Sequence, residues 1–155
     1  MAAESPEKLI ASNKKAFHEY FVLQKVEAGL ELTGTEVKSL RDGRAELKDS
    51  YVIFKNGEAF LFGAHIAPYS HGNLQNHDPD RTRKLLLHRR EIEKLHTQVA
   101  EKGLSIVPLR LYFRGSRVKA EIGVVRGKKL YDKRETEKRR EADREAAVAI
   151  KSRRT

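Results

Sequence analysis

Cysteine is absent from the 155-residue sequence, so the chain can form neither a disulfide nor a thiolate metal site. Long apolar runs are absent as well, and no window approaches the roughly 20 apolar residues that a membrane-spanning helix needs. The opening stretch, MAAESPEKLIASNKK, contains no apolar run typical of a signal peptide. These absences predict a cytoplasmic protein.

Motifs of catalytic and metal sites are also missing. The sequence has no Gly-x-Ser-x-Gly elbow, and residues 123–129 have one residue too few between their glycines to form a phosphate loop. Lys129 also stands where such a loop needs Ser or Thr to bind magnesium. His65, His71 and His77 recur every six residues, but this spacing does not place them on one helical face, and it favours a structural or surface role. We therefore predict no enzymatic activity, no metal and no cofactor.

Basic residues outnumber acidic ones, with 32 Lys and Arg against 22 Asp and Glu and a net charge of +10. Such an excess is informative about partners rather than about fold. Nucleic acid is the first candidate partner, an anionic membrane surface is the second, and the acidic substrate of an enzyme is the third. Half of the excess lies in residues 127–155, which hold eleven basic and six acidic residues.

This basic tail, residues 127–155, has few large apolar side chains beyond Leu130 and Tyr131. It cannot bury enough surface to offset the entropy of ordering it, so we expect it to be solvated and mobile when free. Its residues nevertheless favour helix, because Asp132 can cap one with Glu135 and ion pairs at i,i+3 and i,i+4 follow. Each pair contributes roughly 0.2–0.5 kcal/mol, so a polyanionic partner would have to supply the rest of the ordering free energy.

The first part of the chain carries signals for a leader, a strand and a helix. Residues 1–12 are typical of a flexible leader, and residues 13–32 follow a strand-like alternation. Thr33 and Glu36 form a Thr-x-x-Glu capping box, which predicts a short helix. We expect this helix to end at Gly43.

Two hairpins are expected, each marked by a turn between runs of β-branched and aromatic residues. The first covers residues 51–62 and turns at Asn56-Gly57, because both turn positions favour positive φ. The second joins residues 105–114 to residues 119–126.

Between the hairpins, residues 65–81 are rich in His, Asn, Pro, Gly and Asp and predict a long surface loop. Residues 85–87 are either a short buried strand or the entry to a helix. Helical spacing then relates three apolar residues, Ile92, Leu95 and Val99. Gly103 suits the left-handed C-terminal position of that helix.

Five or six strands and two or three helices in about 115 residues predict a mainly β fold, a small closed or partly open barrel with appended helices. The expected organisation is a flexible leader over residues 1–12, a barrel domain over residues 13–126 and a disordered basic tail over residues 127–155. Barrels of this kind commonly bind oligonucleotides on an exposed sheet face.

Basic and aromatic side chains occur together within the barrel domain. The basic ones are Lys14, Lys15, His18, Lys38, Arg41, Arg81, Arg83, Lys84, Arg89 and Arg90, and the aromatic ones are Phe17, Tyr20, Phe21 and Tyr69. Any one of these cations is most simply a solvated surface charge. Together they offer several phosphate contacts, which favours nucleic acid as the partner without defining its kind.

Six blocks of sequence, in order between residues 13 and 135, resemble the SsrA-binding protein family, also called small protein B. They are Asn13-Lys14-Lys15-Ala16 with His18-Glu19-Tyr20, residues 34–41 (GTEVKSLR), Asp49-Ser50-Tyr51, Ile66-Ala67-Pro68-Tyr69, residues 83–88 (RKLLLH), and Gly127-Lys128-Lys129 with Asp132-Lys133-Arg134-Glu135. Each block alone is weak, whereas their combination is highly specific.

The resemblance implies a bacterial RNA-binding adaptor with an oligonucleotide-binding-like barrel. Members of the family bind the tRNA-like domain of transfer-messenger RNA and escort the alanylated RNA, with elongation factor Tu, to stalled ribosomes for trans-translation. The protein body stands in for the missing anticodon arm. The tail enters the empty mRNA channel of the small subunit, beyond the decoding centre, and becomes helical there. Neither a cofactor nor a membrane partner is implied.

The resemblance also assigns residues to two RNA surfaces. Facing the tRNA-like domain it implies Lys14, His18, Glu27, Lys38, Arg83, Leu86 and His88. At the decoding centre and in the mRNA channel it implies Gly127, Lys128, Lys129, Tyr131, Asp132, Lys133 and Arg134, and Ile150 is expected among the small apolar contacts near the end of the tail. Two assignments keep an alternative, since Glu27 is also explained as a surface carboxylate and Leu86 as a core residue.

Two other functions stay open on the sequence. One is a general RNA-binding module that acts as a chaperone, and the other is a hydrolase that acts on RNA. A preference for the tRNA-like domain over unrelated RNAs separates the adaptor from the chaperone. The hydrolase lacks any recognisable catalytic set.

Overall fold

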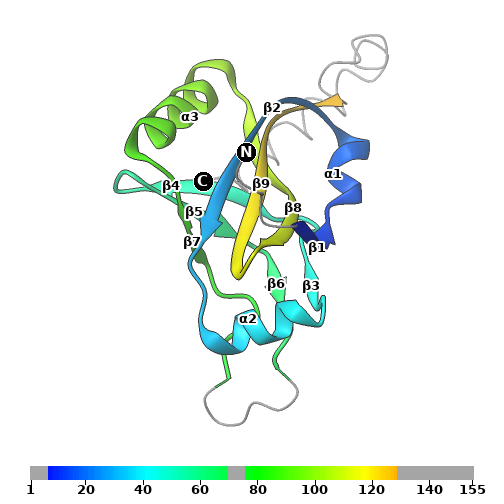
Figure 1. The fold of residues 1–155 in the computed structure, drawn as a ribbon. Coiled ribbons are helices and arrows are strands. Elements are labelled where there is room, and N and C mark those ends of the chain that lie inside the picture. The colour runs from blue at the N-terminus through cyan, green and yellow to red at the C-terminus, as the bar shows by residue number, and fades with distance from the viewer. Residues whose placement is uncertain (1–6, 70–75, 129–155) are drawn as a thin grey trace, which may run out of the picture.

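A curled antiparallel sheet forms the body of the protein in the computed structural model, which describes residues 7–69 and 76–128. The strands in these residues are β1 (Glu7–Ser12), β2 (Tyr20–Leu30), β3 (Ala45–Glu46), β4 (Tyr51–Lys55), β5 (Glu58–Phe62), β6 (His65–Ile66), β7 (Arg83–Leu86), β8 (Ser105–Arg114) and β9 (Arg117–Gly127). The helices are α1 (Lys14–Glu19), α2 (Gly34–Arg41) and α3 (Arg89–Lys102). Helices α1 and α3 lie on opposite sides of the sheet at one end, and α2 lies at the other end (Figure 1).

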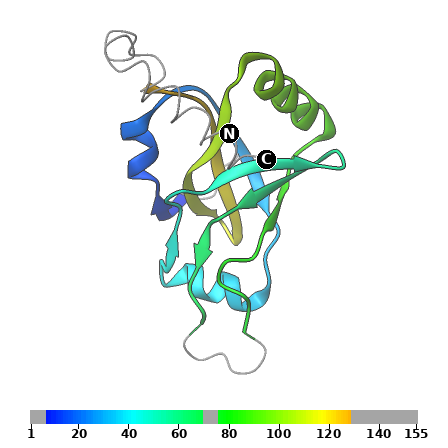
Figure 2. The same cartoon turned by 180° about the vertical axis from the view of Figure 1, so that it is seen from behind.

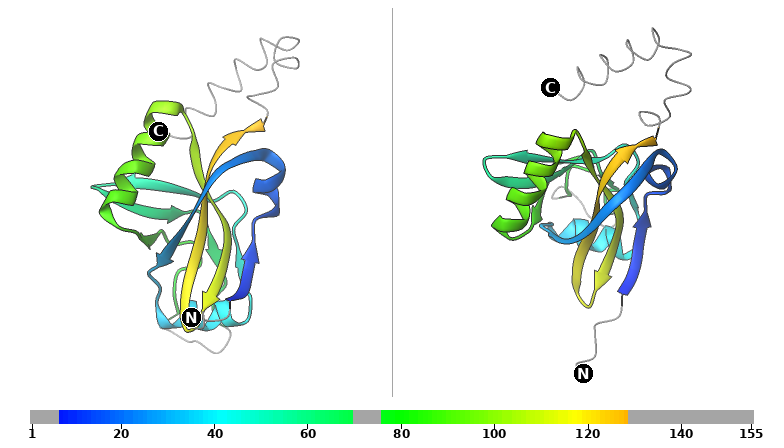
Figure 3. Two further views of the ribbon diagram at one scale, coloured as in Figure 1. Left: turned by 45° about the horizontal axis from the view of Figure 1, so that its top comes forward. Right: turned by 90° about the horizontal axis from the view of Figure 1, so that it is seen from above.

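Seven strands pair in the order β1-β8-β9-β2-β7-β5-β4, and β3 pairs with β6 in a separate two-stranded sheet. The large sheet folds back on itself, so that β4 packs against β8 although the two strands are not neighbours in the hydrogen-bonded order. The β4–β5 hairpin consequently runs steeply across β8 and β9 (Figure 2, Figure 3). The prediction of a mainly β, oligonucleotide-binding-like fold with appended helices is therefore confirmed.

Local turn and cap signals account for the elements that were predicted correctly. Asn56 and Gly57 have φ values of 55° and 75°, and they connect β4 to β5 as the tight turn requires. The Thr33 N–H donates to Glu36 Oε1 at 2.8 Å at the start of α2. At the end of α3, Gly103 has φ 63° and donates its N–H to the Val99 carbonyl.

Two expectations about the first part of the chain are corrected by the structure. Residues 7–12, expected in a flexible leader, form β1 and pair with β8. Residues 14–19, expected to continue a strand, form α1, because Asn13 caps it by accepting the Ala16 N–H at 3.2 Å. The buried Asn13 side chain also donates to the carbonyls of Leu47 and Pro108, which fixes the start of α1 on the barrel.

The described residues between the hairpins contain two strands rather than a continuous surface loop. His65–Ile66 form β6, and Arg83–Leu86 form β7, which settles the alternative between strand and helix there. His77 supports this segment, because its ring nitrogens lie 2.8 Å from Thr35 Oγ1 and 2.9 Å from the Ile66 carbonyl oxygen. His71 lies outside the described residues.

Two apolar clusters hold the helices on the sheet. The larger one includes Leu40 of α2 and Leu95 of α3, which are both almost fully buried. The smaller one packs Ala16 of α1 against Leu109 and Val125. None of the helices in residues 7–69 and 76–128 has the length and hydropathy that crossing a bilayer requires.

Candidate RNA interface

An open groove of about 660 Å³ lies where β2 and β7 meet the turn of the β4–β5 hairpin and the start of α3. Three residues assigned to the RNA surface from the sequence, Glu27, Leu86 and His88, line this groove together. They come from β2, from β7 and from the N-cap of α3. The fold therefore gathers at one place residues that are up to 61 positions apart in the chain.

Leu86 is held at the surface of the groove, and the alternative of a core position is wrong. Its side chain is 49% exposed, and it lies opposite Gly29 in the pairing of β2 with β7. A Cβ atom at Gly29 would lie only 3.1 Å from Leu86 Cβ, so the glycine leaves room for the leucine to cross the strand. An exposed leucine in a groove offers a flat apolar contact to a ligand.

Hydrogen bonds from Tyr112 and Arg114 hold the carboxylate of Glu27 in place. The Tyr112 hydroxyl donates to Glu27 Oε2, and the Arg114 guanidinium donates to the same oxygen at 2.8 and 3.2 Å. Glu27 Oε1 accepts no hydrogen bond from the described part of the chain. Since the side chain is 38% exposed, this second oxygen can accept a hydrogen bond from a ligand.

These contacts favour the ionised carboxylate. The hydrogen bond from Tyr112, aided by Arg114, lowers the pKa of Glu27 below its usual value. Burial, together with the bond to Glu27, raises the pKa of Tyr112 to about 12, so its hydroxyl remains a donor near neutral pH. The groove thus contains a charged acceptor with a fixed orientation.

Cations edge the groove next to this acceptor. Lys84, Arg89 and Lys119 line it, and Lys84 Nζ lies 2.9 Å from Glu58 Oε2. The sequence analysis did not assign Lys119 and Gly29 to the site. Only the register of β2 with β9, which places the two residues opposite each other, identifies them. Two further carboxylates, Glu58 and Glu91, line the groove as well, so its cations and carboxylates are equal in number. An acceptor, cations and an apolar side chain in one groove match the phosphates, base edges and base faces of an RNA ligand.

Three further residues assigned to the same RNA surface lie elsewhere. Lys14 and His18 are exposed on α1, four residues apart on one helical face, on the opposite side of the sheet from α3 (Figure 1). Lys38 is exposed on α2, at the other end of the barrel, with its Nζ 5.7 Å from the centre of the Tyr69 ring. A ligand that contacts the groove as well as Lys14, His18 and Lys38 would have to extend from α3 to both α1 and α2.

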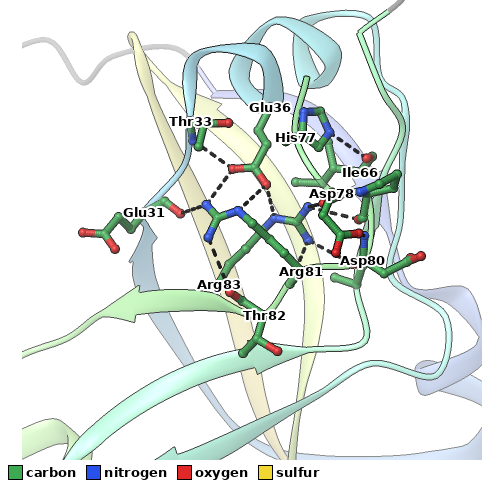
Figure 4. Close-up of polar contacts among 12 residues, drawn as sticks. Glu31, Thr33, Glu36, Ile66, His77, Asp78, Asp80, Arg81, Thr82 and Arg83 are labelled. Atoms are coloured by element: carbon green, nitrogen blue, oxygen red, sulfur yellow. Dashed lines mark hydrogen bonds and ion pairs between the residues drawn. The ribbon is translucent and has the colours of Figure 1, made fainter. Parts of the chain in front are cut away.

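Arg83, the remaining residue of that set, does not reach any surface. Its side chain is 0% exposed, and its Nε donates to Glu36 Oε2 at 2.6 Å. Its other nitrogens donate to backbone carbonyls, namely those of Ala64, Asp78, Pro79 and Arg81 (Figure 4). The expectation of an RNA contact is therefore corrected to a structural role, because burial leaves the guanidinium inaccessible to a ligand.

The carboxylate that binds Arg83 is itself buried and fully used. Glu36 accepts from Arg81 at 2.8 and 2.9 Å as well as from Arg83 and the Thr33 N–H (Figure 4). Burial alone would raise the pKa of this carboxyl, but the hydrogen bonds from Arg81, Thr33 and Arg83 outweigh it and lower the pKa to about 2. This cluster joins α2 to the segment before β7.

The start of the basic tail is anchored beside α1. Gly127 ends β9 opposite Tyr20, and Lys128 Nζ donates to the Phe17 carbonyl at 3.3 Å. The same ammonium lies 5.3 Å from the centre of the Phe21 ring. The other residues assigned to the decoding centre and mRNA channel, Lys129, Tyr131, Asp132, Lys133, Arg134 and Ile150, lie outside the described residues.

An oligonucleotide-binding-like sheet whose groove combines basic side chains with an exposed leucine is typical of nucleic-acid-binding proteins. The sequence model described as SmpB protein matches residues 10–152, and the chain belongs to this family. It is 59% identical over 147 residues to the SsrA-binding protein of Geotalea uraniireducens, covering 95% of this chain and 97% of the relative. With the SsrA-binding protein of Geobacter sulfurreducens it shares 58% identity over 94% of this chain and 95% of the relative.

A solved structure agrees with the fold. It is described as "tmRNA-SmpB: a journey to the center of the bacterial ribosome", and one of its chains is 45% identical to this one with a TM-score of 0.69. The match covers 88% of this chain and 93% of that chain.

Proposed function

We propose that the protein binds transfer-messenger RNA and delivers it to stalled ribosomes for trans-translation. The observation that carries this proposal is the 45% identity, over 88% of the chain, to a solved chain described as tmRNA-SmpB of the bacterial ribosome. The relatives named SsrA-binding protein, which match nearly end to end, support the same function.

The groove is proposed to receive the tRNA-like domain of the RNA. Glu27 Oε1 accepts a hydrogen bond from the RNA, Leu86 packs against a sugar or base, and His88 lies beside them. Lys84, Arg89 and Lys119 contact phosphates along the edge of the groove. Lys14, His18 and Lys38 act from their own helices as further contacts, whereas Arg83 supports α2 from inside.

The tail is proposed to act on the ribosome. Gly127 and Lys128 start it beside α1, and Lys129, Tyr131, Asp132, Lys133 and Arg134 occupy the decoding centre. The segment that contains Ile150 continues into the empty mRNA channel. The alanylated RNA arrives with elongation factor Tu. In this proposal the protein works as an adaptor in the cytoplasm and catalyses no reaction.

Removal of residues 129–155 tests this division of labour. The truncation keeps β9 and Lys128, so the barrel and groove should remain intact. We expect affinity for the tRNA-like domain to stay close to that of the full chain, while peptide tagging on stalled ribosomes is abolished. Loss of RNA binding on truncation would contradict the proposal.

A second experiment separates the adaptor from a general RNA chaperone and from an RNA hydrolase. The labelled tRNA-like domain is bound to the full chain and then challenged with unrelated structured RNAs at moderate salt. The adaptor keeps a large preference for the tRNA-like domain, whereas a chaperone exchanges freely. The recovered RNA is then analysed for length, because cleavage would indicate a hydrolase.

A further inference from the structure

An apolar patch surrounds the point where the tail leaves the barrel, and the proposed function does not use it. It consists of Phe17 on α1 and Phe21 and Leu23 on β2, whose side chains are 41%, 46% and 48% exposed. With Lys25 and Lys128 they line a shallow hollow of about 580 Å³. Large apolar side chains that gather on a surface mark an interaction site more often than scattered ones do.

A β-bulge in β2 and the N-terminal cap of α1 fix the positions of these side chains. The β2–β9 pairing passes from Val22 opposite Val125 to Gln24 opposite Val124, so Leu23 is an extra, bulged residue. A bulge of this kind redirects a side chain and occurs often beside functional sites. Phe17 is equally fixed, because α1 is anchored by the buried Asn13 at its N-terminus.

The charges of the hollow indicate the chemistry of its partner. Among the described residues that line it, the charged ones are Lys25 and Lys128. Lys128 is held in the hollow, because it donates to the Phe17 carbonyl and lies over the Phe21 ring. The complementary ligand offers a flat apolar face and negative charge within a few ångströms of each other. An unstacked nucleobase with its phosphate has both properties.

We propose that an unpaired base of small-subunit ribosomal RNA stacks on Phe17 and Leu23, with its neighbouring phosphates bound by Lys25 and Lys128. This inference rests on the proposed function, since Lys128 begins the segment that enters the decoding centre. Ribosomal RNA is favoured over transfer-messenger RNA because Lys128, which lines the patch and is bound to the Phe17 carbonyl there, begins the tail that is proposed to enter the decoding centre. The patch docks the body of the protein beside the decoding centre.

Substitutions at Phe17 distinguish ring stacking from simple apolar contact. Phe17→Tyr keeps the ring, whereas Phe17→Leu keeps an apolar side chain and removes it. We expect Phe17→Tyr to tag peptides on stalled ribosomes like the parent chain. Phe17→Leu should lose on the order of 10-fold, in line with the effect of removing one base-stacking ring. Equal tagging by both variants would overturn the proposal.

A double variant and its control test the whole patch. Phe17→Ala with Leu23→Ala should bind the tRNA-like domain as tightly as the parent chain, yet tag more weakly than Phe17→Leu alone. Leu9→Ala, at a leucine that is 56% exposed on β1, is the control and should leave tagging unchanged. Thermal unfolding of each variant verifies the fold. If the double variant tags normally while removal of residues 129–155 abolishes tagging, the patch proposal fails and the proposed function stands.

Crosslinking identifies the partner directly. A photoreactive phenylalanine analogue at position 17 of the full chain, bound to stalled ribosomes with transfer-messenger RNA, should crosslink to small-subunit ribosomal RNA. Crosslinks chiefly to a ribosomal protein, to transfer-messenger RNA or to the protein's own tail would each overturn the proposal.

Discussion

Two clusters of glutamate and arginine lie in the same barrel and have opposite properties. Glu36 and Arg83 are both 0% exposed, and both carboxylate oxygens of Glu36 accept hydrogen bonds within the protein. Glu27 and Arg114 are 38% and 32% exposed, and within residues 7–69 and 76–128 the donors to Glu27 all meet one oxygen. Both oxygens of the first carboxylate are therefore occupied, so this cluster is closed, whereas the second carboxylate lines the groove with one oxygen that has no donor among the described residues.

The comparison shows that residue type alone does not separate a structural ion pair from a binding site. A buried charge requires partners for nearly all of its polar atoms, and Arg83 obtains them from Glu36 and backbone carbonyls. A carboxylate at a basic surface needs donors to fix it and a free lone pair to bind a ligand, and Glu27 has both. Burial and the number of remaining acceptors therefore decide the role.

The largest expected effect comes from breaking the closed cluster. Glu36→Gln leaves Arg83 buried without its counter-charge, and removing one partner of a buried pair costs about 3–5 kcal/mol of unfolding free energy. Urea unfolding measures this loss. Glu58→Gln is the control, because its pair with Lys84 is exposed and should contribute about 0–1 kcal/mol. Similar losses in both variants would show that the closed cluster is not special.

The pH dependence of stability tests the closed cluster in a second way. The pKa of Glu36 is lowered from 4.5 to about 2, so its contribution is present above about pH 4.5 and is lost as the pH falls towards 2. The parent chain should therefore lose about 3 kcal/mol more than Glu36→Gln across this range. Urea unfolding of both proteins at a series of pH values isolates the difference, because the other carboxylates titrate in both. Parallel pH profiles would contradict the assignment.

The turns and helix ends that depend on neighbouring residues were predicted correctly from the sequence. The features that depend on burial and on distant contacts were not. The capping box at Thr33, the Asn56-Gly57 turn and the left-handed Gly103 each specify backbone geometry within a few residues, and all three were correct. Arg83 was misassigned because the block RKLLLH alternates exposed and buried residues whose orientation depends on strand pairing. Helix α1 was missed because Asn13 caps it with help from distant carbonyls.

Within the candidate site, the sequence identified residues that are proposed to contact the ligand and missed the residues that hold them in place. Glu27, Leu86 and His88 were assigned from resemblance, and the fold brings them to one groove. Tyr112 and Arg114 were not assigned, because they lie on β8, which is separated from β2 by β9, and their side chains reach Glu27 across that strand. Contacts across non-adjacent strands have no signature in a single sequence.

Neutralising the carboxylate of the second cluster should affect RNA binding rather than stability. Glu27→Gln keeps the shape of the side chain but removes its charge, and a hydrogen bond to a charged group is worth roughly 1.5–3 kcal/mol. We expect affinity for the tRNA-like domain to fall by about 10-fold or more. The unfolding free energy should change by less than about 1 kcal/mol, because Glu27 is partly exposed. Unchanged affinity would remove Glu27 from the proposed site.

The smallest effect is expected at the support of that carboxylate. Tyr112→Phe removes the hydroxyl that donates to Glu27 Oε2 but leaves Arg114 in place. The carboxylate should turn more freely, and affinity for the tRNA-like domain should fall roughly threefold, which corresponds to about 0.6 kcal/mol. Tyr51→Phe, at an exposed tyrosine on β4, is the matched control and should have no effect.

A double-mutant cycle and a pH series then separate positioning from general destabilisation. If Tyr112 acts through Glu27, the effect of Tyr112→Phe disappears in a Glu27→Gln background, whereas a destabilising change would persist there. The Tyr112 hydrogen bond lowers the pKa of Glu27, so its loss raises that pKa towards the usual value. On acidification, RNA affinity of the Tyr112→Phe variant should consequently decline at a higher pH than that of the parent chain. Additive losses in the cycle, or coincident pH profiles, would make Tyr112 a core residue like any other on β8.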